Sequence, residues 1–141
     1  MYLLDTNVVS ELRKVRSGKA DPKVAAWADT VDAADLYISV ITLQEIEIGI
    51  LLMENRDPAQ GKILRAWLEA HLLPAFANRI LPVDEAVARR SAQLHVPKPR
   101  PVRDGLIAAT ALVHSMTVVT RNVADFVSTG APIVDPWRGI A

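Results

Sequence analysis

The sequence contains no cysteine, and this absence excludes several kinds of site. Disulfide bridges, thiolate–zinc centres and cysteine nucleophiles all require a thiol. Net charge is absent as well, because 16 basic residues balance 16 acidic ones. Proteins that hold nucleic acid passively usually carry a basic excess, since their affinity comes largely from phosphate neutralisation. The composition therefore argues against a stand-alone nucleic-acid-binding protein, but it allows an enzyme that contacts a few phosphates.

Long hydrophobic runs are also missing. The longest apolar stretches, residues 46–53 and 106–113, are too short to cross a bilayer. The N-terminus has no basic segment and reaches the polar Asp5-Thr6-Asn7 after four residues, so we expect no signal peptide. Half of the residues are hydrophobic and 23% are charged, which is too apolar for a disordered chain. We expect a single cytoplasmic domain, residues 1–141, that does not associate with membranes.

Strand-like and helix-like patterns alternate along the chain. Asp21-Pro22 has the form of a helix N-cap followed by proline at the first helical position, and the apolar residues after it recur at helical spacing. Short runs typical of buried strands lie at residues 1–4, 36–41, 79–83, 117–120 and 132–137. This alternation predicts an α/β fold in three layers, with helices on both faces of a central, mostly parallel sheet.

Acidic residues follow several of these predicted strands. Asp5 ends the first strand, Glu45 comes soon after the second, and Asp125 follows the strand at 117–120. Asp104 opens a helix so poor in charge that it must be buried. Right-handed crossovers place every strand-to-helix junction at the same edge of a parallel sheet. We therefore expect the four carboxylates to meet in one crevice.

Two of the acids, Glu45 and Asp104, also have a purely structural explanation, as do Thr6 and Asn7. Thr42 and Glu45 have the spacing of a capping box, in which Glu45 would satisfy backbone amides. Asp104 lies at a helix N-terminus, where the helix dipole favours an acid. Thr6 and Asn7 are competent N-caps for the helix after the first strand. Spacing alone does not separate these roles from metal binding.

Four neighbouring carboxylates with no lysine among them repel one another, so they require either protonation or a cation. The three histidines show no pairing at helical spacing, and carboxylate oxygens select magnesium or manganese. Such ions generate hydroxide from bound water and stabilise the leaving oxygen of a phosphodiester. The residues themselves thus predict a divalent-metal site, with phosphoryl hydrolysis as its chemistry.

Four sequence motifs, in this order, resemble the PIN domain, and more narrowly the VapC and FitB-like toxins of bacterial toxin–antitoxin pairs. They are Leu3-Leu-Asp-Thr-Asn7, Glu45 after the second strand, Asp104-Gly-Leu-Ile-Ala-Ala-Thr-Ala111 and Val119-Thr-Arg-Asn-Val-Ala-Asp-Phe126. The closing Asp135-Pro-Trp137 is similar to the terminal strand of the FitB-like branch. The resemblance covers essentially the whole chain.

This resemblance implies a magnesium- or manganese-dependent endoribonuclease with a PIN-like fold. The acids of the family, which bind metal and catalyse, fall on Asp5, Glu45, Asp104 and Asp125. The polar residues that support such a site correspond to Thr6, Asn7, Thr120 and Asn122. Arg121 is either a phosphate contact or a charge at the rim.

The resemblance also implies partners. A cognate antitoxin protein would cover the acids and inhibit the enzyme, and operator DNA would be bound through the antitoxin alone. RNA would be the substrate, and a homodimer or a higher assembly is the expected state.

Two other functions are compatible with parts of the sequence. One is a catalytically silent PIN-fold module that acts through a protein partner, although a binding role does not require four acids. The other is a phosphatase of the haloacid-dehalogenase type, but that chemistry needs a second aspartate two residues after the first, where this chain has Asn7.

Overall fold

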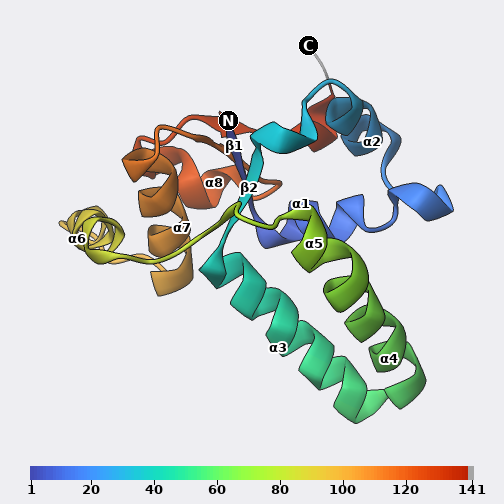
Figure 1. Cartoon of the computed structure of the whole chain (residues 1–141). Coiled ribbons are helices and arrows are strands. Elements are labelled where there is room, and N and C mark those ends of the chain that lie inside the picture. The colour runs from blue at the N-terminus through green and yellow to red at the C-terminus, as the bar shows by residue number, and fades with distance from the viewer. Residues whose placement is uncertain (140–141) are drawn as a thin grey trace.

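The computed structural model describes residues 1–139 and contains a five-stranded sheet (Figure 1). All neighbouring strands are parallel, and their order is β3-β2-β1-β4-β5. The strands are β1 (Tyr2–Leu4), β2 (Leu36–Ser39), β3 (Ile80–Leu81), β4 (Thr117–Val119) and β5 (Ile133–Val134). The predicted parallel α/β sheet is confirmed, and the first strand of the chain lies at its centre.

Helices cover both faces of this sheet (Figure 1). One face carries α6 (Glu85–Leu94), α7 (Val102–Val113) and α8 (Val123–Phe126). The other carries α1 (Thr6–Leu12), α2 (Pro22–Asp29), α3 (Val40–Arg56) and α4 (Pro58–Trp67), which continues through a π-helical turn, η3 (Leu68–Leu72), into α5 (Leu73–Ala75). Short 3-10 turns complete the chain: η1 (Val15–Ser17), η2 (Ala33–Asp35), η4 (Val127–Thr129) and η5 (Pro136–Arg138). Within residues 1–139, no helix combines the length and apolarity needed to cross a membrane.

Side chains along the central strands point alternately to the two faces of the sheet, and this divides the core into two clusters. Leu3 and Val118 point into the cluster under α6, α7 and α8, whereas Leu4 and Val119 point into the cluster under α1 to α4. Successive residues of a strand face opposite sides, so two adjacent apolar residues contribute one to each layer. Short, largely apolar strands are therefore what a three-layer fold requires here.

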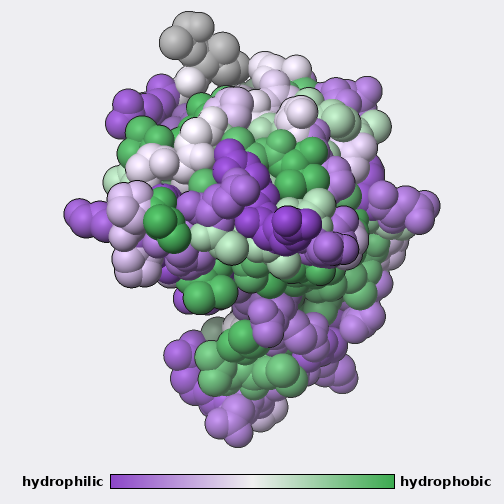
Figure 2. Space-filling view, turned by 90° about the vertical axis from the view of Figure 1, so that its left-hand side faces the viewer, coloured by the Kyte–Doolittle hydropathy of each residue, from purple (hydrophilic) through white to green (hydrophobic). Residues whose placement is uncertain are grey.

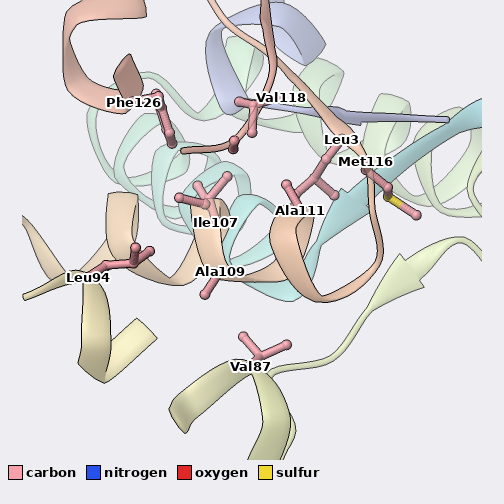
Figure 3. Close-up of a cluster of buried hydrophobic side chains, with 11 residues drawn as sticks. Leu3, Val87, Leu94, Ile107, Ala109, Ala111, Met116, Val118 and Phe126 are labelled. Carbon is pink, nitrogen blue, oxygen red and sulfur yellow. The ribbon is translucent and has the colours of Figure 1, made fainter. Parts of the chain in front are cut away.

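Helix α7 is buried on two sides (Figure 3). Ile107 and Ala111 lie on the side toward the sheet, near Val118 and Leu3, while Ala109 lies on the side toward Val87 of α6. The small residues allow α6 to approach closely, which explains the almost charge-free sequence of α7. This packing fixes the N-terminus of α7, and with it Asp104, against the edge of the sheet.

Helices α3 and α4 form a hairpin that projects from the body of the protein (Figure 1). A Cβ atom on Gly61 would lie 2.5 Å from the Cα atom of Glu54, so the two helices meet backbone to backbone at this point. Arg65 on α4 bonds Glu47 and Glu54 across the hairpin. The projecting end displays both hydrophobic and polar side chains (Figure 2).

Two details of the sequence prediction are wrong. Helix α3 begins at Val40, earlier than expected, because the Ser39 hydroxyl caps it by accepting a hydrogen bond from the Ile41 amide at 3.0 Å. Thr42 therefore lies inside the helix, fully buried, and does not form a capping box with Glu45. At α1, Asp5 itself is the N-cap, in place of Thr6 or Asn7.

Candidate active site

Four acidic side chains from four separate segments line one cavity of about 470 Å³. It lies at the edge of the sheet where β1 ends, beside the N-termini of α1, α7 and α8. Besides the four acids, the cavity is lined by three polar residues, one proline and one arginine: Thr6, Asn7, Asn122, Pro101 and Arg103. The structure thus brings together the four carboxylates that the order of strands and helices predicted to meet.

Asp5 is buried and held by several hydrogen bonds. Its backbone amide donates to Val119 O at 2.9 Å, which ties the end of β1 to β4. Its Oδ1 caps α1 by accepting from the Thr6 amide at 2.8 Å. Its Oδ2 accepts from Thr120 Oγ1 at 2.8 Å and from Asn7 Nδ2 at 3.3 Å. Asp5 is therefore both a structural cap and a fixed carboxylate at the bottom of the cavity.

Glu45 lies in the second turn of α3 and points across to α1 and α7. Its Oε1 accepts a hydrogen bond from Thr6 Oγ1 at 3.1 Å, and its Oε2 accepts one from Arg103 Nη1 at 2.9 Å. The alternative in which Glu45 caps its own helix is wrong, because the carboxylate bonds side chains of other elements.

Asp104 is in the first turn of α7, and Asp125 is in the first turn of α8. Burial raises the pKa of the Asp104 carboxyl above its ordinary value, and repulsion from Asp125, Asp5 and Glu45 raises it further, while Arg103 lowers it. Burial is the larger cause, and the added repulsion indicates that Arg103 does not fully compensate the negative charges of this cavity.

The remaining polar residues predicted for the site divide into two groups. Thr120 and Asn7 bond Asp5 directly, and the Thr120 hydroxyl also accepts from the Asn122 amide at 3.0 Å. Arg121 behaves differently: its amide donates to Asn7 Oδ1 at 3.2 Å, but its guanidinium lies over the ring of Trp137, 5.2 Å from the centroid. Arg121 is not one of the residues that line the cavity.

Arg103 and Pro101 line the cavity although the sequence did not single them out. The feature of the sequence that could have pointed to Arg103 is its position beside Asp104 at the start of a helix. That place did not reveal its partner, which lies 58 residues earlier in the chain.

The donor set fits a hard divalent cation, since it consists of carboxylate oxygens that repel one another. In the described part of the chain, however, no group of three or more acidic or histidine side chains is already arranged to hold a metal ion. Two of the carboxylates are turned toward other partners, Asp5 toward Thr120 and Glu45 toward Arg103. Metal binding through Glu45 Oε2 requires Arg103 to be displaced, whereas Asp5 Oδ1 accepts a single hydrogen bond and keeps a lone pair for a cation.

Comparisons with known proteins agree with this architecture. The model of the PIN domain family matches residues 2–130. Toxin FitB from Neisseria gonorrhoeae is 39% identical over 98% of this chain and 99% of its own length. VapC ribonuclease Y4jK from Sinorhizobium fredii is 38% identical over 98% of this chain and 99% of its own length.

A solved structure of FitAB bound to an IR36 DNA fragment superimposes with a TM-score of 0.86 at 39% identity. The match covers 97% of this chain and 96% of that one. The fold, the family model and relatives aligned over nearly their whole length agree, so the chain belongs to the PIN domain family, in its VapC/FitB-like branch.

Proposed function

We propose that this chain is the toxin of a toxin–antitoxin pair and a divalent-metal-dependent endoribonuclease. The observation that carries the proposal is the cavity in which Asp5, Glu45, Asp104 and Asp125 converge from four segments. The toxin and ribonuclease names of relatives at 39% and 38% identity support it.

In this proposal the four acids would hold Mg²⁺ or Mn²⁺. The bound ion supplies an activated water and neutralises charge on the scissile phosphate. Asp5 is positioned for this role by the Thr6 amide and by the Thr120 hydroxyl, both at 2.8 Å. These bonds hold the carboxylate in one orientation, so it does not have to be ordered when the cation arrives.

Asp104 and Asp125 complete the negative wall of the cavity. The repulsion from Asp125, Asp5 and Glu45, which adds to burial in raising the pKa of Asp104, supports a cation-binding role, because a divalent ion would offset that repulsion. Thr6 joins two of the acids, since its amide bonds Asp5 and its hydroxyl bonds Glu45. Thr6, Asn7, Thr120 and Asn122 are therefore proposed as supporting residues, and Arg121 as a rim residue that is anchored on Trp137.

Cleavage of total cellular RNA by the purified, antitoxin-free chain tests this proposal. With Mg²⁺ or Mn²⁺ we expect discrete fragments, and with chelator or with Asp5→Asn we expect none. Mapping the fragment ends would identify the RNA target. Folded protein that cuts no cellular RNA with either ion would contradict the proposal and favour a catalytically silent module.

We propose a cognate antitoxin as the protein partner, with operator DNA bound through it. A series of cavities leads away from the acids and could receive a peptide segment. Thr6 and Glu45 line both the acidic cavity and a neighbouring one of about 310 Å³, and Arg13 and Trp67 line both that neighbour and a third of about 360 Å³. A segment that follows this path would cover the acids. RNA cleavage inside cells also implies that the chain acts in the cytoplasm.

Toxicity can be tested in vivo. Expressed alone in bacteria, the chain should arrest growth, and Asp104→Asn should relieve the arrest. Growth at the normal rate with well-folded wild-type chain would contradict the toxin role.

We further propose a homodimer or higher assembly that uses the outer face of α3. Ile48, Leu51 and Leu52 on this helix are 47%, 53% and 66% exposed. Large exposed apolar side chains that follow one another on a projecting helix are typical of an interaction surface.

A further inference from the structure

The Arg103 guanidinium donates a hydrogen bond to a carboxylate oxygen of Glu45, a proposed metal ligand. Arg103 Nη1 lies 2.9 Å from Glu45 Oε2, while Thr6 Oγ1 lies 3.1 Å from Glu45 Oε1. Both oxygens of Glu45 therefore already have a donor. A cation that binds Glu45 through Oε2 must first displace the arginine.

We propose that Arg103 is a built-in counter-ion of Glu45 that competes with the divalent cation and, once displaced, binds a phosphate oxygen of the RNA. This inference rests on the proposed ribonuclease function and assigns a positioning residue to its active site. It also accounts for the orientation of Glu45, one of the four acids, toward Arg103.

The ion pair can be broken at small cost. The Arg103 side chain is 64% exposed and that of Glu45 is 21% exposed, so the pair lies at the mouth of the cavity. Ion pairs open to solvent contribute little net stability, because water and salt replace much of the attraction. A divalent ion that contacts several carboxylates gains more from Glu45 than one guanidinium does.

Arg103 can exchange partners more easily than Arg65 can. Arg65 bonds two glutamates, Glu47 and Glu54, and is locked between two helices. Arg103 has Glu45 as its one recorded carboxylate partner in residues 1–139 and lines the acidic cavity. A planar guanidinium released at that position presents the paired donors that suit a phosphate oxygen.

Calorimetric titration of the full, metal-free chain with Mn²⁺ tests the competition. We expect Arg103→Gln to bind Mn²⁺ about three- to tenfold more tightly than wild type, because a positive charge next to the site is removed. Arg103→Lys, which keeps the charge, should return most of the way to the wild-type affinity. Arg89→Gln is the matched control, since Arg89 is 81% exposed and pairs with Glu85 on α6, away from the cavity; it should leave Mn²⁺ binding unchanged.

A second experiment tests whether the displaced Arg103 binds phosphate. It measures the affinity for a short phosphorothioate single-stranded RNA at saturating Mn²⁺. Here Arg103→Gln should weaken binding roughly threefold or more, because one charged phosphate contact is lost. Opposite effects on the two affinities distinguish a transferred contact from a merely structural residue, whose loss would weaken both.

Unchanged or weaker Mn²⁺ binding by folded Arg103→Gln would overturn the competition, and unchanged RNA binding would overturn the transfer to phosphate. Failure of the proposed function gives a different result. In that case the wild-type chain itself would bind no Mn²⁺, or Asp5→Asn would bind it as well as wild type.

Discussion

At the scale of single residues, Asp5 links the fold to the cavity. Its carboxylate caps α1 through the Thr6 amide, and the buried Thr120 hydroxyl donates to its other oxygen. The same Thr120 oxygen accepts from the Asn122 amide. One buried hydroxyl thus joins the ends of β1 and β4, and its removal leaves two polar groups without this partner.

Thr120→Val should therefore destabilise the protein although the two side chains have nearly the same shape. We expect a loss of about 1–3 kcal/mol in the free energy of unfolding, because a buried carboxylate oxygen and an amide lose their partner. Urea denaturation measures this loss. Thr120→Ser keeps the hydroxyl and should retain most of the stability; equal losses in the two variants would argue against the hydrogen bond.

Asp104 should make stability depend on pH in the metal-free protein. Burial and neighbouring acids raise its pKa in the folded state above the ordinary value of 3.8. A carboxyl with a raised folded-state pKa favours folding fully below the unfolded-state value, and this contribution is lost as the pH rises through the folded-state pKa.

In chelator at pH 7.5, Asp104→Asn should therefore melt at a higher temperature than wild type, and the difference should shrink toward pH 4. Differential scanning calorimetry at the two pH values measures this effect. Saturating Mg²⁺ should reverse the order, since the cation binds ionised Asp104. A metal-free variant that melts below wild type at pH 7.5 would show that the charge repulsion is unimportant.

At the scale of elements, the α3–α4 hairpin depends on one close contact. Gly61 lies so near to Glu54 that an added Cβ would come within 2.5 Å of a backbone atom. Gly49, in contrast, is exposed on α3 with nothing within 4 Å of a Cβ at that position. The two glycines of this hairpin should therefore respond oppositely to the same substitution.

Gly61→Ala should lower the free energy of unfolding by about 1–3 kcal/mol, because the helices must separate to admit the methyl group. Gly49→Ala should raise it by about 0.5–1 kcal/mol, because glycine in a helix interior loses more backbone entropy on folding than alanine does. Chemical denaturation of both variants measures these changes in the free energy of unfolding. If both substitutions raised the free energy of unfolding, the close contact at Gly61 would be contradicted.

At the scale of the whole molecule, the hairpin extends from the sheet (Figure 1), and its projecting end displays hydrophobic surface (Figure 2). Leu51 and Leu52 of α3 are exposed there. These side chains contribute little to the core of one protomer, because more than half of their surface faces solvent. Their burial would require a second molecule.

Leu51→Glu combined with Leu52→Glu should therefore convert an assembly to monomers while leaving the fold intact. Size-exclusion chromatography with light scattering measures the mass, and circular dichroism reports the fold. Val96→Glu, at a 75% exposed position in the loop after α6, is the control and should keep the wild-type mass. A double variant with the same mass as wild type would contradict the proposed interface on α3.

The sequence by itself determined the parallel α/β architecture and the edge at which the acids gather. These features follow from local information: adjacent apolar pairs such as Leu3-Leu4 supply both faces of the sheet, and chain order places each strand-to-helix junction at one edge. Element boundaries were less well determined, because Ser39 and Thr42 are both competent caps and packing selected Ser39.

Tertiary structure decided which side chains hold the acids. Thr6 bonds Glu45 across 39 residues, Arg103 bonds Glu45 across 58, and Thr120 bonds Asp5 across 115. Sequence periodicity records which face of an element is buried, but it contains no information on which distant donor reaches a given carboxylate. That choice depends on how the helices pack around β1. It made Arg103 the partner of Glu45, for which the sequence offered a metal-binding role or a helix cap.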